Sequence, residues 1–175
     1  MTYVMLTVEQ LRHTKATNPF VIKNPDQVTN AFTSTDKQMA ADKLKLTERE
    51  QIEEVKNLVR GHDMTSISSK DLREIGLALN RTGLIDDETF WVFSNALLAT
   101  DENSKPTLQD VKFNALALFN ERYEEYRDFL ESNPRDVNKG TLEWQQALVA
   151  ANHAISALSY FSNSTRADLA IDERA

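Results

Sequence analysis

The sequence has 175 residues, of which 41% are hydrophobic, and its net charge at pH 7 is -7. A chain of this length holds one domain with a substantial core and leaves little room for a second full domain. It contains no cysteine, which excludes disulfides, thiol nucleophiles and thiolate metal sites.

Composition predicts the fold class. Only four glycines and four prolines occur, while alanine, leucine, glutamate, lysine and glutamine are plentiful, a balance that favours helices. We predict an all-α fold, a bundle of about five helices with an irregular N-terminal arm. The first thirty residues contain no long apolar run and no basic start leading into one, so the sequence predicts neither a secretory signal nor a membrane span. We therefore expect a cytoplasmic location.

The charge is unevenly distributed along the chain. Residues 1–46 carry six basic and four acidic side chains, whereas residues 47–175 carry fourteen basic and twenty-three acidic ones. An acidic body repels phosphate backbones, which argues against nucleic acid as a partner. Binding to nucleic acid would require the basic side chains to gather on one surface, namely those of Lys37, Lys43, Lys45, Arg49 and Lys56.

The N-terminal arm, residues 1–46, differs in composition from the rest of the chain. It is rich in threonine, asparagine, aspartate and lysine, and Pro19 and Pro25 each follow an asparagine. These features favour turns and extended pieces. The apolar group Phe20–Ile22 can dock on the body, so a docked arm and a mobile arm both remain open.

A helical body is predicted from residue 47 to residue 162. Thr47 and Glu50 have the spacing of a capping box, and Val55 and Val59 belong to an apolar stripe that ends before Gly61. The sequence therefore predicts a first body helix between Thr47 and Gly61.

The stretch 69–99 predicts two helices around a tight turn. The first helix is expected to start at Ser69, whose hydroxyl can accept from free amides of the first turn. Gly83 stands where a left-handed residue closes a Schellman ending, and Asp86 is expected to cap the second helix. Two helices joined by so short a turn must pack against each other.

This helical pair is not a DNA-reading helix-turn-helix. The apolar position expected six residues after the turn glycine is occupied by Thr89. The second helix also begins Asp86, Asp87 and Glu88, which places three acids where phosphates and base edges would lie. A structural hairpin is the better interpretation.

The next segment is a polar connector followed by two longer helices. Asp101–Lys112 starts like a calcium loop, but Pro106 stands where glycine is needed and Lys112 where a bidentate glutamate is needed, so we exclude calcium binding. We predict one helix from Leu108 to about residue 132, capped by Thr107. A final helix is predicted from residue 140 to about residue 161, followed by a weakly helical tail at residues 163–175.

Catalytic, metal and cofactor motifs are not found in the sequence. His13, His62 and His153 are scattered and belong to no metal-binding spacing. Glu121 and Glu125 share a helix face with Asp128, a pattern typical of a solvated charged strip. The sequence predicts no catalytic residues, no metal and no cofactor, and no phosphate loop or nucleotide fingerprint is present.

Aromatic residues provide the main functional hint. Trp91 lies one position off the apolar stripe of its helix, and Phe113 and Phe129 lie off the stripe of theirs. Exposed aromatic side chains mark protein interfaces, whereas burial under the arm or in a second core face is the alternative. We predict a non-enzymatic protein-interaction module, an adaptor, chaperone or regulatory subunit, whose partner is another protein or a second copy of itself.

The alternative hypothesis is a small-ligand-binding protein or an enzyme. Its polar pocket would form around His153 and Tyr160, which lie two helical turns apart. A boundary histidine bonded to a neighbouring group is the structural explanation for the same residue.

Overall fold

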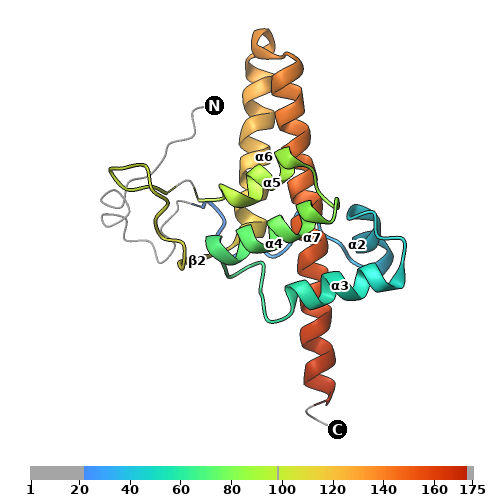
Figure 1. Cartoon of the computed structure of the whole chain (residues 1–175). Helices are drawn as coiled ribbons and strands as arrows, with labels where there is room; N and C mark the ends of the chain where they lie inside the picture. The colour runs from blue at the N-terminus through green and yellow to red at the C-terminus, as the bar shows by residue number, and fades with distance from the viewer. Residues whose placement is uncertain (1–21, 98, 173–175) are drawn as a thin grey trace.

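The computed structural model describes residues 22–97 and 99–172, and this part of the chain is mostly helical (Figure 1). In chain order its elements are α2 (Lys37–Lys43), α3 (Arg49–Val59), β1 (Ile67–Ser68), α4 (Ser69–Arg81), α5 (Asp87–Ser94), β2 (Lys112–Phe113), α6 (Ala115–Ser132), the 3-10 helix η1 (Pro134–Asp136) and α7 (Lys139–Asp172). The prediction of an all-α bundle with an irregular arm is confirmed. No described helix is both long enough and apolar enough to cross a membrane.

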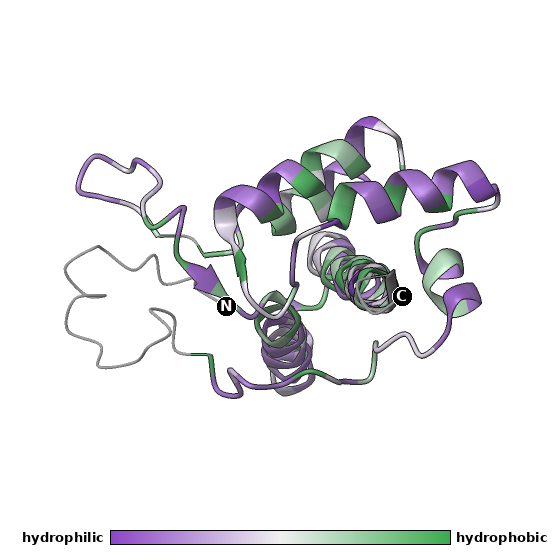
Figure 2. Cartoon of the chain, turned by 90° about the horizontal axis from the view of Figure 1, so that it is seen from below, coloured by the Kyte–Doolittle hydropathy of each residue, from purple (hydrophilic) through white to green (hydrophobic). Residues whose placement is uncertain are grey.

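The central element is α7, which contacts α2, α3, α5 and α6. Viewed along α7, the other helices lie around it (Figure 2). Its middle part is buried on several sides, and small side chains such as Ala151, Ala154 and Ala157 let the neighbouring helices approach closely. With 34 residues it is about 50 Å long.

The predicted end of this helix near residue 161 is wrong, because α7 continues to Asp172. Two contacts to the loop after α3 hold the extension. The Ser162 hydroxyl donates to the carbonyl of His62, and the Arg166 guanidinium lies 3.0 Å from the Asp63 carboxylate. Burial raises the pKa of Asp63, but hydrogen bonds from Thr65 and the Arg166 charge outweigh it and leave the pKa below its usual value.

The α4–α5 hairpin forms as its sequence predicts. Gly83 has a positive φ of 74°, its amide donates to the Asn80 carbonyl at 2.9 Å, and the Leu84 amide donates to the Leu79 carbonyl at 2.9 Å. These are the two bonds of a Schellman ending. The Asp86 side chain accepts from the backbone amide of the residue three positions on, at 2.8 Å. Only the first cap differs by one position: α4 begins at Ser69, but Ser68 caps it.

The predicted start of the next helix at Leu108 is wrong. Leu108 has a positive φ of 57°, and Lys112–Phe113 pairs instead with Ile67–Ser68 as a short antiparallel sheet. Helix α6 begins after this pairing, where the Asn114 side chain accepts from the backbone amide three residues later at 3.0 Å.

The described part of the arm lies on the body. Ile22 and Phe32 are buried, and the Asn114 side-chain amide donates to the carbonyls of Pro25 and Gln27. The Phe32 ring packs edge-on against Tyr123 at 5.2 Å between centroids. Residues 1–21, including the apolar Phe20, lie outside the described residues.

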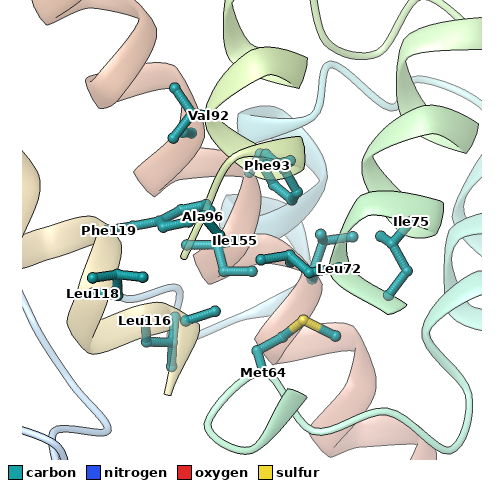
Figure 3. Packing of buried hydrophobic residues seen from close by; sticks show 14 of the residues in the cluster. Met64, Leu72, Ile75, Val92, Phe93, Ala96, Leu116, Leu118, Phe119 and Ile155 are labelled. Atoms are coloured by element: carbon teal, nitrogen blue, oxygen red, sulfur yellow. The ribbon is translucent and has the colours of Figure 1, made fainter. Parts of the chain in front are cut away.

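The hydrophobic core fills the space between α4, α5, α6 and α7 (Figure 3). Phe93 and Phe119 meet edge to face at its centre, with ring centroids 5.2 Å apart. Gly76 lets α4 approach α5 at this point, because a Cβ atom there would lie 2.8 Å from the Cβ atom of Phe93. All the described α-helices contribute side chains to this one core.

Candidate protein-interaction groove

An aromatic groove opens on the outer part of the bundle, where α5 meets the α6–α7 pair. Its rings come from three helices: Trp91 from α5, Tyr126 and Phe129 from α6, and Trp144 from α7. The groove has a volume of about 640 Å³. We call this site, together with its rim residues Arg135, Asp136, Asn138 and Thr141, the aromatic groove.

The rings are arranged in two contacting pairs. Trp91 and Trp144 meet edge to face with centroids 5.3 Å apart, and Tyr126 stacks on Phe129 at 6.1 Å. Both geometries are favourable for aromatic pairs. Trp91 nevertheless remains 44% exposed, so the groove presents an indole to solvent.

Local sequence explains how each ring reaches the groove. Tyr126 and Phe129 are three residues apart and therefore share one face of α6. Trp144 lies in the second turn of α7. The end of α6 and the start of α7 run side by side and project beyond the other helices (Figure 1). Two further large apolar side chains, Val137 and Leu142, are exposed near the turn between these two helices.

Two of the rim residues are occupied with capping α7. The Thr141 backbone amide donates to the Asn138 side-chain oxygen at 3.2 Å, and the Asn138 backbone amide donates to the Thr141 hydroxyl oxygen at 2.9 Å. This reciprocal pair satisfies amides that a helix start leaves open. Asn138 and Thr141 therefore hold the shape of the rim and have less hydrogen-bonding capacity for a ligand.

The other two rim residues have unused charges. Arg135 and Asp136 are neighbours in η1. Within the part of the chain that the structure describes, the Arg135 guanidinium and the Asp136 carboxylate make no ion pair or hydrogen bond. The groove thus combines apolar aromatic walls with one available cation and one available anion. Burial raises the pKa of the Tyr126 hydroxyl.

The structure brings together two of the three aromatic residues that the sequence singled out. Trp91 and Phe129 both line the groove. Phe113 does not contribute to a surface, because it is 3% exposed and pairs with Ile67 in the small sheet. Its predicted place in an interface is therefore wrong. The strand pairing that buries it joins residues far apart in the sequence and could not be seen from the helical pattern. Sequence reasoning missed Tyr126 and Trp144 as groove residues because both fit the apolar stripes of their helices.

The second predicted site does not assemble as expected. His153 borders two surface recesses, one beside α2 and one beside the α4–α5 turn. Tyr160 lines neither recess and instead packs edge-on against Phe161. His153 and Tyr160 therefore do not share a pocket there.

His153 sits in an unusual environment. Its ring meets the Phe32 ring edge to face at 5.2 Å, and its Nδ1 atom is buried without a hydrogen-bond partner. Burial lowers the pKa of His153, and the nearby Lys43 charge lowers it further. Lys43 itself donates to the carbonyl of Phe32 and to the Ser156 hydroxyl oxygen, and burial lowers its pKa.

The acidic strip on α6 has a structural role. The Lys23 amide donates to Glu121 at 2.8 Å, and the Lys23 ammonium donates to Glu125 at 2.8 Å. Burial is the main cause that raises the pKa of Glu121. The strip thus holds the arm on α6. No group of three or more histidine, aspartate or glutamate side chains among the described residues is placed to hold a metal ion.

Comparisons with known proteins identify no relative. No protein-family model, curated protein or solved structure matches this chain. The functional interpretation therefore depends on the groove itself.

Proposed function

We propose that this chain is a non-enzymatic protein-interaction module, an adaptor, chaperone or regulatory subunit, that binds its partner in the aromatic groove. The observation that carries the proposal is Trp91, 44% exposed beside Trp144 in a groove walled by two further rings. Tryptophan, tyrosine and arginine dominate the binding energy of protein interfaces. The absence of cysteine from the sequence fits a cytoplasmic setting for this interaction.

The groove supplies the two components that interfaces need. Fully burying one apolar side chain of a partner on its rings contributes about 1.5–3 kcal/mol. The charged rim formed by Arg135 and Asp136 adds orientation, because charge-assisted hydrogen bonds are directional. An apolar centre with a polar rim is the usual anatomy of an interface.

The test compares Trp91→Ala with Leu169→Ala, an equally exposed apolar side chain at the far end of α7. Partners captured from the native organism by the unaltered chain are purified and titrated against each variant. We expect Leu169→Ala to bind like the unaltered chain and Trp91→Ala to bind at least about tenfold more weakly. Equal binding by Trp91→Ala contradicts the proposal.

Intrinsic fluorescence gives an independent readout of the same site. The chain has two tryptophans, and both line the groove. A partner that occupies the groove should therefore shift the tryptophan emission and protect it from acrylamide quenching. A partner that binds without either change docks elsewhere and contradicts the proposal.

A small-ligand-binding function near His153 is the second candidate. The buried Nδ1 atom without a partner favours it, because such a group gains from a hydrogen-bonding group that a ligand brings. A fragment library titrated against the isotope-labelled protein tests it. Ligand-induced shifts of the Lys43 resonances that disappear in His153→Ala support a ligand site, and resonances of His153 and Lys43 that stay unchanged in the unaltered chain contradict it.

A further inference from the structure

We propose that the aromatic groove of one chain packs against the same groove of a second copy and forms a two-fold symmetric dimer. This inference rests on the proposed function, because it assumes that the groove is an interface, and it commits to one occupant. Three observations lead to it: the charges of the rim, the exposed apolar side chains in and near the groove, and the position of the groove on the molecule.

The rim charges are self-complementary. In a two-fold interface each contact occurs twice with the two chains exchanged, so residue i of one copy meets residue j of the other and the reverse. Arg135 and Asp136 are adjacent, opposite in charge, and without a side-chain partner in the described part of the chain. A two-fold axis between them places Arg135 opposite Asp136 of the second copy and satisfies both charges twice.

The chemistry of the pair suits this arrangement. A guanidinium and a carboxylate form two parallel hydrogen bonds, which fix orientation as well as add binding energy. A partner with a purely acidic or purely basic surface would satisfy one of the two rim charges and repel the other. A second copy of the chain satisfies both.

The apolar surface around the rim has the same self-complementary character. Trp91 lines the groove and is 44% exposed. Val137 and Leu142, which follow the rim residues Asp136 and Thr141 in the sequence, are 42% and 43% exposed. Exposed large apolar side chains that gather in one place mark association sites on soluble proteins. Pairing the two grooves would cover the exposed Trp91 of both copies.

The position of the groove permits the contact. The outer ends of α6 and α7 project beyond the other helices (Figure 1), so two copies can approach through this part while their α2–α4 regions stay apart.

Charge exchange between two variants tests the proposal. Size-exclusion chromatography with light scattering should give twice the 19.9 kDa mass of one chain. Arg135→Asp places two acids on each rim and Asp136→Arg places two bases, so each variant alone should associate at least about tenfold more weakly. An equal mixture of the two variants should restore the dimer, because one rim is then acidic and the other basic.

Control variants separate the outcomes. Lys105→Asp changes the net charge as much as Arg135→Asp does, in an exposed loop, and should leave the dimer intact. Circular dichroism of each variant checks that the fold is kept. The inference is wrong if the unaltered chain is a monomer at all concentrations. It is also wrong if Arg135→Asp and Asp136→Arg each still form dimers, or if their mixture stays monomeric.

Failure of this inference is distinguishable from failure of the proposed function. If the unaltered chain is monomeric but Trp91→Ala loses a foreign partner, the groove is an interface and only the second copy is wrong. If the chain is monomeric and Trp91→Ala binds every partner normally, both proposals are wrong.

Discussion

The inner and outer parts of the α6–α7 pair use different side chains for different purposes. In the inner part, small residues such as Ala151 and Ala154 bring the helices together, and the buried Asn152 amide donates to the carbonyls of Phe119 and Leu148 at 2.9 and 2.8 Å. In the outer part, large rings line an open groove and the charges of Arg135 and Asp136 have no partner in the described chain. The same two helices thus build a core at one end and present a site at the other.

The largest expected effect compares two aromatic residues of α5. Phe93 is fully buried against Phe119, whereas Trp91 is 44% exposed in the groove. Phe93→Ala should lower the free energy of unfolding by about 3–5 kcal/mol, because it removes burial and leaves a cavity. Trp91→Ala should lower it by only about 1–2 kcal/mol, because the exposed ring loses little beyond its edge-to-face contact with Trp144.

Urea unfolding followed by circular dichroism measures both variants. The division into a core part and a site part predicts that Phe93→Ala affects stability and that Trp91→Ala affects binding. Similar losses of stability in the two variants would show that the groove belongs to the core.

The second effect concerns the close approach of α4 and α5. A Cβ atom on Gly76 would lie 2.8 Å from the Phe93 Cβ atom, and that atom moves only if the α5 backbone moves. Gly76→Ala should therefore destabilise the protein by about 1–3 kcal/mol, although alanine favours a helix by about 1 kcal/mol over glycine.

Gly140→Ala is the matched control at the outer end of α7. A Cβ atom there meets the Asn138 side-chain oxygen at 3.3 Å, which a small rotation relieves. Its effect on thermal unfolding should stay within about 1 kcal/mol. A loss as large as that of Gly76→Ala would show that the close approach of the Phe93 Cβ atom is not what makes the substitution of Gly76 costly.

The sequence predicted the elements whose boundaries are set locally. The α4–α5 hairpin was predictable because Gly83 and Asp86 act on backbone groups within a few residues of themselves. The start of α6 was not, because Lys112–Phe113 is held by a strand some forty-five residues earlier in the chain. The extension of α7 to Asp172 likewise depends on distant contacts at His62 and Asp63.

The groove was predictable only in part for a similar reason. Trp91 and Phe129 were each identified because they lie off the apolar stripe of their own helix. The same criterion also selected Phe113, which is buried in the small sheet. Tyr126 and Trp144 fit their stripes, so periodicity assigned them to the core. Their convergence depends on how α5 meets the α6–α7 pair, which periodicity within one helix does not encode.

The third effect compares helix caps in the two parts. The Asp86 carboxylate accepts from the Thr89 amide at 2.8 Å at the start of α5, and Asp86→Ala should lower the free energy of unfolding by about 1 kcal/mol. Asn138→Ala removes the cap of α7 at the outer end and should speed amide hydrogen exchange there, with a smaller change in global stability. Hydrogen exchange measured by mass spectrometry separates the two, and equal global losses would contradict the comparison.

The smallest effect concerns His153 in the inner part of α7. Its buried Nδ1 atom has no hydrogen-bond partner, unlike the side-chain amide nitrogen of the neighbouring Asn152. Burial and the Lys43 charge lower the pKa of His153, so the unfolded chain, with a histidine pKa of about 6.5, binds more protons near that pH than the folded chain does. Stability should therefore be complete above about pH 6.5, fall as the pH drops below it, and level off below the folded pKa.

Other groups face His153, and the control must remove their contribution. Asp36, Asp42 and Lys43 line the recess beside α2, and the recess beside the α4–α5 turn has its own charges, namely those of Lys43, Lys45, Asp86, Asp87 and Glu88. The difference in stability between the unaltered chain and His153→Gln isolates the imidazole, because these charged groups are common to both proteins. The effect should be small because His153 is partly exposed and solvent screens its charge. If the difference in the free energy of unfolding between the two proteins is constant from pH 5 to pH 8, the predicted pH dependence is wrong, since protonation of His153 would then cost the folded chain nothing.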